Sequence, residues 1–255
     1  MGGEVARPLL LSARQIAIAA IFGAIAMITT GLGLALPGYL PLVNFELQGT
    51  FIIIATMAAG PIAGTVVAFL VSLVSAVGVI SFPFYIPHIL VFAVAYRWIW
   101  KQEDWAVKTV AFWAVSAIAL FIQYWGWWWL YAAVFQVMTV EAMFYYNMAA
   151  PYVVFLLIWA LLPYVVFVTA PDFAKPRWNA PYVTWFAALA TVIAIGLGSA
   201  WWPGGPVVAF LDFGLGQIFA YTGETWQIVG AIAIIIVTLA VSYYFHSRKP
   251  FQPKE

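Results

Sequence analysis

Cysteine is absent from this chain of 255 residues, and charged residues make up only 7% of it. The first absence excludes disulfides, thiolate metal sites and cysteine nucleophiles within the chain. The second excludes an ordinary water-soluble domain, in which about a quarter of the residues are charged. Histidine occurs only at His88 and His246, which the expected topology puts on opposite sides of a membrane. We therefore expect no histidine pair that holds haem, copper or zinc.

Signatures of catalysis are equally scarce. The chain has no phosphate-cradling glycine loop followed by a lysine, so it is not expected to bind and hydrolyse ATP unaided. We expect no enzymatic activity, no cofactor and no nucleic-acid partner. What the chain has in excess is hydrophobic residues, at 66%. This composition predicts an integral membrane protein whose surroundings are the lipid bilayer.

Long apolar stretches recur along the chain. A helix needs about 20 apolar residues to cross the hydrocarbon core of a bilayer. We predict an all-α integral membrane protein, a polytopic bundle of about eight transmembrane helices. Segment 126–146 is aromatic at both ends and is interpreted as an interfacial or re-entrant segment. The expected spans are residues 15–36, 49–59, 62–81, 86–100, 109–124, 148–169, 182–200 and 227–245.

The ten basic residues fall into four short clusters between these stretches. Because Lys and Arg are retained on the cytoplasmic side during insertion, the clusters predict a multi-pass cell-membrane protein with both termini in the cytoplasm. The outer side then carries acidic residues and no basic ones. The clusters are Arg7 and Arg14; Arg97, Lys101 and Lys108; Lys175 and Arg177; and Arg248, Lys249 and Lys254.

Polar and aromatic residues gather in the predicted outer half, a pattern typical of a small-molecule pocket. Carboxylates and aromatic faces without basic side chains favour a neutral or cationic ligand. An aromatic belt explains most of the tryptophans but not the amides and His88, because polar groups at membrane depth are costly unless paired. The group also includes Tyr85, Gln123 and Tyr124. We select as substrate-binding residues Asn44, Glu46, Gln48, His88, Trp127, Trp128, Glu141, Tyr146 and Asn147.

These residues have different expected roles. Glu46 or Glu141 would recognise charge, because each adjoins a predicted membrane boundary beside amides or aromatic rings. Trp127, Trp128 or Tyr146 would stack on the ligand, and the amides and His88 would hydrogen-bond to it. We expect the other two outer acids, Asp212 and Glu224, to be exposed to solvent and not to bind the ligand. A metal site built from outer carboxylates is disfavoured for the same reason.

Small residues recur every three or four positions in the first span, at Ala13, Ala17, Ala20 and Ala24. Small residues at this spacing let helix backbones approach closely in lipid. Two interpretations stay open at this point. The ladder packs inside the protein, or it is a docking face for another membrane subunit.

The stretch NFELQGTFIIIATMAAGPIAGTVVAFLVSLVSA, from Asn44 to Ala76, resembles the substrate-binding S components of energy-coupling factor transporters. In that family an apolar helix follows an outer loop, and a Gly-Pro-x-x-Gly-like turn then leads into a helix with small and hydroxyl residues. The first span, ARQIAIAAIFGAIAM, is similar to the family's first helix. The resemblance implies a six-helix core over residues 1–175 with a mobile loop after helix one. Two further helices and a basic tail, residues 176–255, exceed the family's six.

The resemblance also implies a function. An S component captures a vitamin-like molecule on the outer face and works with a transmembrane coupling subunit and two ATPase subunits. Ala20 and Ala24 would face the coupling subunit. The alternative is an accessory or structural subunit of a large membrane complex, of respiratory or oxidase type, with no cofactor of its own. A stand-alone transporter or channel is less favoured, because no intramembrane charge pair or symmetric repeat is visible.

Overall fold

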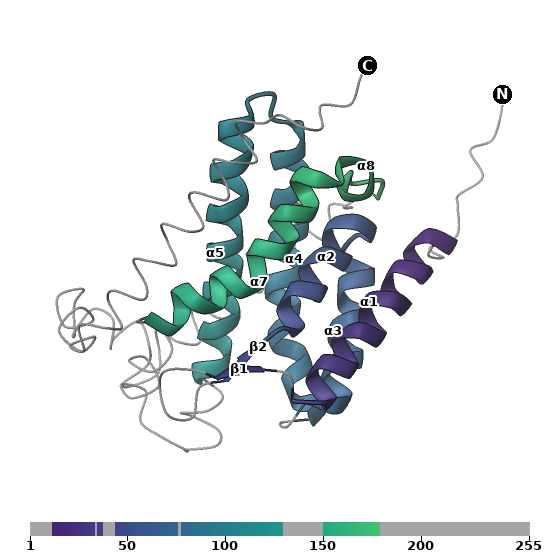
Figure 1. Ribbon diagram of the computed structural model, residues 1–255, viewed down its shortest axis with the longest axis vertical. Helices are drawn as coiled ribbons and strands as arrows, with labels where there is room; N and C mark the ends of the chain where they lie inside the picture. Colours follow the sequence, from purple (N-terminus) through teal and green to yellow (C-terminus); the bar gives the residue numbers. More distant parts are fainter. Residues whose placement is uncertain (1–11, 34, 38–43, 76–77, 130–149, 179–255) are drawn as a thin grey trace.

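The computed structural model describes residues 12–33, 35–37, 44–75, 78–129 and 150–178. These residues form a helical bundle with one small two-stranded sheet (Figure 1). The predicted spans 182–200 and 227–245 lie outside the described residues, so the proposed division of the chain at residue 175 stays a prediction. The elements are α1 (Ala13–Gly31), β1 (Ala35–Pro37), β2 (Asn44–Glu46), α2 (Gln48–Ala59), α3 (Pro61–Val74), η1 (Gly78–Ser81), α4 (Phe82–Lys101), α5 (Trp105–Trp129), α7 (Ala150–Thr169) and α8 (Pro171–Ala174).

Four helical segments are long and apolar enough to cross a membrane: α1, α4, Trp105–Tyr124 of α5 and Tyr152–Thr169 of α7. Helices α2 and α3 are apolar but shorter, at 12 and 14 residues. At about 1.5 Å per residue, each falls short of the roughly 30 Å hydrocarbon core. The described part of the chain is therefore that of a helical, multi-pass membrane protein. The six spans expected before residue 175 correspond to six helices, of which only four have full crossing length.

Two predicted boundaries around the third and fourth spans are corrected. The sequence predicts a helix up to residue 81, but α3 ends at Val74 and the 3-10 turn η1 follows. The sequence predicts that Pro83 and Pro87 mark an outer turn and that the next span begins at residue 86. Helix α4 instead begins at Phe82, so both prolines lie inside it. Pro83 fits because the N–H groups of a first turn have no intrahelical acceptor, whereas Pro87 removes one backbone hydrogen bond.

Helix α5 is longer than predicted at both ends. It begins at Trp105 because the carboxylate of Asp104 caps it, accepting the backbone N–H groups of Ala106 at 2.7 Å and Val107 at 3.0 Å. It continues to Trp129, so the start of segment 126–146 belongs to this helix and is not a separate interfacial element. The rest of that segment lies outside the described residues.

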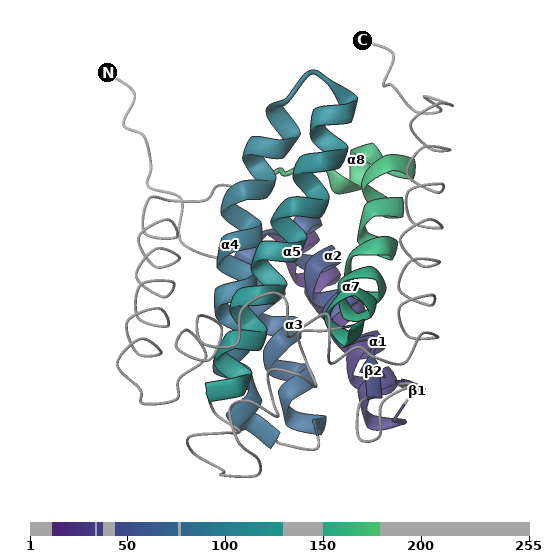
Figure 2. The ribbon, with the colours of Figure 1, turned by 90° about the vertical axis from the view of Figure 1, so that its left-hand side faces the viewer.

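The two strands pair antiparallel, with Ala35 opposite Glu46 and Pro37 opposite Asn44. This hairpin connects the end of α1 to the start of α2 at the bottom of Figure 1, while the α4–α5 turn and α8 lie at the other end. Figure 2 shows α4 and α5 side by side, in agreement with the many contacts between them. The basic residues of the described ranges lie at the α8 end, and Glu46 lies at the hairpin end. Which end faces the cytoplasm stays a prediction.

Three glycines allow helices to pack with little space between their backbones. A Cβ atom added to Gly49 of α2 would lie 1.9 Å from the ring of Trp159 on α7. One added to Gly64 of α3 would lie 2.0 Å from Thr56 Oγ1, and one on Gly23 of α1 would lie 2.6 Å from Leu70. A Cβ atom at Gly49 or Gly64 would overlap its neighbour, whereas at Gly23 the end of the flexible Leu70 side chain would have to move. Glycine thus permits these close helix contacts.

The predicted break at Gly60-Pro61 is a reversal between α2 and α3. Gly60 has a φ of 94°, a left-handed conformation that glycine adopts readily, and Pro61 opens α3. The carbonyl groups in the last turn of α2 lack intrahelical donors. Trp178 Nε1 donates to the Met57 carbonyl at 3.1 Å, and Gln15 Nε2 donates to the Ala59 carbonyl at 2.8 Å.

We predict that Gly49→Ala lowers the free energy of unfolding by about 1–3 kcal/mol, the usual effect of overpacking a close contact. The added methyl group would overlap the Trp159 ring. Gly31→Ala is the matched control, because its Cβ would lie 3.9 Å from Val74, an ordinary contact distance. The free energies of unfolding of the two variants are measured in the same detergent. A Gly49→Ala protein as stable as the control would contradict the close packing of α2 on α7.

Candidate functional site

The side-chain amide of Gln48 is the centre of a buried hydrogen-bond network at the hairpin end. Its Nε2 donates to the hydroxyl of Tyr85 at 2.7 Å and to the Glu46 carboxylate. Its Oε1 accepts the hydroxyl of Thr30 at 3.0 Å. Gln48 is 4% exposed and Tyr85 is 1% exposed. The network therefore uses both kinds of group on the amide and joins α1, β2, α2 and α4.

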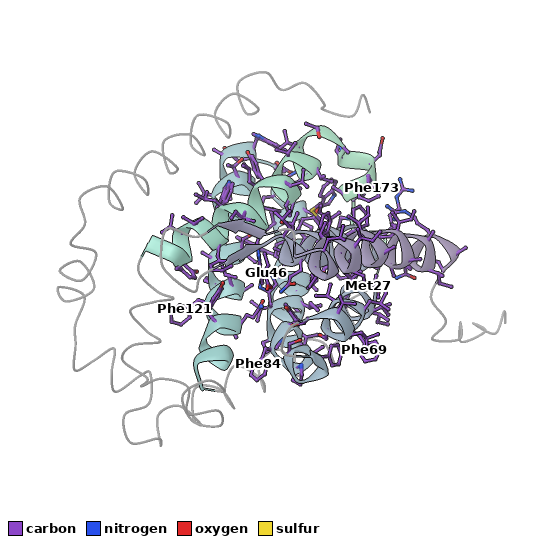
Figure 3. All side chains as sticks on the ribbon, turned by 60° about the horizontal axis from the view of Figure 1, so that its bottom comes forward. Met27, Glu46, Phe69, Phe84, Phe121 and Phe173 are labelled. Atoms are coloured by element: carbon purple, nitrogen blue, oxygen red, sulfur yellow. The ribbon has the colours of Figure 1, made fainter. Side chains whose placement is uncertain are left out.

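Glu46 is the acidic member of this network. Viewed from the hairpin end, it lies near the middle of the bundle, whereas Phe69 and Phe121 lie at the periphery (Figure 3). Its backbone carbonyl accepts the indole N–H of Trp159 at 2.8 Å. Burial raises the pKa of the Glu46 carboxyl above its ordinary value, and the hydrogen bond from Gln48 opposes that shift only in part. The site therefore holds a desolvated carboxyl group, which a proton or a cation would stabilise.

Aromatic rings line the region beside this carboxyl group. The ring centroids of His88 and Trp159 are 5.9 Å apart, in an edge-on arrangement. Trp159 also lies 6.5 Å from Tyr124 and 6.3 Å from Phe155, measured between ring centroids. These rings come from α4, α5 and α7. They form an apolar wall next to the polar network, the combination that small-molecule sites use.

Unpaired polar atoms are buried close to that wall. Within the described residues, both ring nitrogens of His88, Ser116 Oγ and Gln123 Oε1 have no hydrogen-bond partner. All three side chains are at most 2% exposed. His88 lies on α4, and Ser116 and Gln123 lie on α5, seven residues and thus about two helical turns apart. Buried unpaired groups destabilise a protein, and inside a membrane bundle they mark functional positions.

The structure brings three of the predicted site residues together: Glu46, Gln48 and His88. The others are not tested. The side chain of Asn44, on β2, and those of Trp127 and Trp128, at the end of α5, are outside what the structure describes. Glu141, Tyr146 and Asn147 lie outside the described residues altogether.

Sequence reasoning missed several members of the site, among them Thr30, Ser116 and Trp159. Thr30 lies in the last turn of an apolar helix, where a hydroxyl group usually bonds to its own backbone, so its sequence position gives no signal. Trp159 gave a weak sequence signal. Tryptophan prefers membrane interfaces, but this one lies well inside span 148–169. Tyr85 was named in the polar and aromatic group of the predicted outer half, and it precedes His88 by three residues and so shares its helix face.

The small-residue ladder of α1 faces away from the bundle. Ala13, Ala17, Ala20 and Ala24 are all exposed. These four alanines therefore do not pack against the described part of the bundle, and docking of the ladder on another subunit stays a prediction. Internal packing instead uses the neighbouring pair on another face of α1, Ala19 and Gly23, which are buried. Gly23 is the residue that contacts Leu70 of α3.

The arrangement offers carboxyl, amide, phenol and imidazole groups beside aromatic rings, which suits binding by hydrogen bonds and stacking. In the ranges that the structure describes, no group of three or more His, Cys, Asp or Glu side chains is placed to hold a metal ion. No protein-family model, curated protein or solved structure matches this chain. The class that the structure defines is thus a helical multi-pass membrane protein with a buried polar cluster at one end.

The raised pKa of Glu46 predicts a pH-dependent stability. A carboxyl group with a raised folded-state pKa stabilises most fully below its ordinary value of 4.5, and this stability is lost as pH rises through the folded-state pKa. The melting temperature of the ligand-free protein should fall across that window. Glu46→Gln should flatten the profile, whereas Glu103→Gln, at an exposed position, should leave it unaltered. Equal pH profiles for native protein and Glu46→Gln would contradict the buried state of this carboxyl.

Proposed function

We propose that this protein is the membrane-embedded substrate-binding subunit of a micronutrient importer, similar to the S components of energy-coupling factor transporters. It captures a vitamin-like small molecule at the hairpin end and works with a transmembrane coupling subunit and two ATPase subunits. The observation that carries the proposal is the buried cluster of Glu46, Gln48, Tyr85 and His88 beside the β1–β2 hairpin.

The polar cluster and the buried polar groups beside it support ligand binding, because only some of these groups are used to hold the fold together. Gln48 is fully hydrogen-bonded and holds four elements together. His88, Ser116 and Gln123 instead keep buried polar atoms that the described residues do not satisfy. A subunit that only filled space in a larger complex would be more stable with apolar residues at these positions. A bound molecule with hydrogen-bonding groups would supply the missing partners.

The charges support a neutral or cationic ligand. Glu46 is a partly desolvated carboxyl group, and Trp159 and Tyr124 offer aromatic faces for stacking or cation–π attraction. The basic residues of the described ranges lie at the opposite end of the bundle. An anionic ligand would meet a negative potential at the hairpin end.

The exposed face of α1 supports the partner assignment. Ala20 and Ala24 leave a shallow strip on the outside of the bundle, where another helix can approach closely. The same two positions match the small-residue pattern of the family's first helix. We therefore assign this strip to the coupling subunit.

The ligand assignment is tested by mass spectrometry of small molecules released from the purified protein, followed by calorimetry with the compound identified. We predict that Glu46→Gln weakens binding of that compound roughly ten- to a hundredfold, the effect of losing one charged hydrogen bond. Glu103→Gln is the control and should bind normally. An anionic compound, or unaltered affinity in Glu46→Gln, would place the site elsewhere.

A separate experiment tests the assignment of the partner subunit. Ala20→Trp combined with Ala24→Trp should keep the compound bound but stop co-purification with ATPase subunits, because bulky side chains block close helix approach. Val110→Trp, at a 69% exposed position of α5, is the matched control for a lipid-facing tryptophan. Co-purification with redox proteins and no small molecule would instead favour the accessory-subunit alternative.

A further inference from the structure

Three basic residues lie in the region where α1 begins and α8 ends, at the other end of the bundle from the polar cluster. Arg14 Nη2 donates to the backbone carbonyl of Phe173 at 2.9 Å, which holds the guanidinium group against α8. Lys175 and Arg177 follow α8 directly and are exposed. Arg177 is close enough to Arg14 to repel it electrostatically. The one acid of this stretch, Asp172, is exposed in the first turn of α8.

The segment that carries the last two cations is anchored on both sides. The backbone N–H of Lys175 donates to the Pro171 carbonyl at 2.8 Å, which closes the short helix. Trp178, 6% exposed, is fixed by its bond to the Met57 carbonyl. These hydrogen bonds fix the chain on both sides of Arg177, just after the α8 residue to which Arg14 donates. Like charges in one region repel each other and raise the free energy, and an anion between them would lower it.

An exposed apolar face of α1 begins next to these basic residues. Ile21 and Ile25 lie seven and eleven residues after Arg14, which puts all three on one face of α1. Ile21 is 58% exposed and Ile25 is 38% exposed. Leu32, 68% exposed, continues the same face at the end of the helix. The surface thus pairs two guanidinium groups with an apolar strip that runs along a membrane-spanning helix.

We propose that this surface binds an anionic phospholipid, with its phosphate between Arg14 and Arg177 and an acyl chain along Ile21 and Ile25. Guanidinium groups match the geometry of phosphate oxygens, and basic sites at the ends of membrane helices suit anionic head groups. A free phosphate ion would use the cations but not the apolar strip. A zwitterionic lipid would use the strip but add a positive charge beside the two arginines.

Native mass spectrometry of the full-length protein in detergent tests the proposal, with phosphatidylglycerol and phosphatidylcholine of equal chain length as probes. We expect preferential retention of phosphatidylglycerol. Arg14→Gln with Arg177→Gln should lower its affinity roughly tenfold or more. Lys101→Gln at the end of α4 removes one positive charge, as Arg177→Gln does, and should leave the affinity unaltered. Arg177→Gln alone, at an exposed position, should still weaken binding if the double variant folds poorly.

Three results would overturn the proposal. The first is equal retention of the two lipids by the native protein. The second is an unaltered affinity for phosphatidylglycerol in Arg177→Gln and in the double variant. The third is displacement of the lipid by inorganic phosphate at equal concentration, which would make this an anion site with no use for the apolar strip. None of these outcomes bears on the small-molecule site at the hairpin end.

Discussion

A buried primary amide in an apolar bundle must have its hydrogen bonds satisfied, and Gln48 meets this requirement with partners from three other elements. Thr30 comes from α1, Glu46 from β2 and Tyr85 from α4. Because an unpaired amide would cost about 1–3 kcal/mol, the positions of these elements are coupled to one another through one side chain. The hairpin, the start of α2 and the middle of the candidate site therefore depend on the same network.

Close packing of α7 on α2 also supports this network. Gly49, the residue after Gln48, leaves room for Trp159 to lie across α2. From there the indole N–H reaches the Glu46 carbonyl and the ring contacts His88. The absence of a side chain at Gly49 thus determines where the Trp159 ring lies in the site. The glycine and the tryptophan are more than a hundred residues apart in the sequence, so local pattern gives no indication that they meet.

Composition and the Gly60-Pro61 break could be interpreted correctly from the sequence. Apolar stretches predict helices, and the start of α2 beside Glu46 was expected within one residue. The helical setting of Pro83 and Pro87 was not predicted, because proline usually breaks a helix. Pro83 lies in the first turn of α4, where proline is tolerated, and Pro87 lies inside the helix. Glu46, Gln48 and His88 could be chosen because polar residues are rare in this chain. Trp159 and Thr30 could not, since their roles arise from contacts between helices distant in the sequence.

The two ends of the bundle have opposite chemistry, and this contrast unites the proposals. The hairpin end holds a buried carboxyl group among aromatic rings and unpaired polar atoms. The α8 end holds exposed cations beside an apolar helix face. A neutral or cationic molecule fits the first and an anionic head group fits the second. The same charge segregation that predicts orientation in the membrane thus also separates two kinds of binding surface.

A double-mutant cycle between Gln48 and Tyr85 tests the central claim most directly. Gln48→Leu, Tyr85→Phe and the double variant are compared by their free energies of unfolding in one detergent. If the buried network joins the helices as described, the two changes are not additive and the coupling free energy is about 0.5–3 kcal/mol. The 2.7 Å bond between Gln48 Nε2 and the Tyr85 hydroxyl would then be shown to act in solution. Additive effects, or single variants as stable as the native protein, would contradict the account.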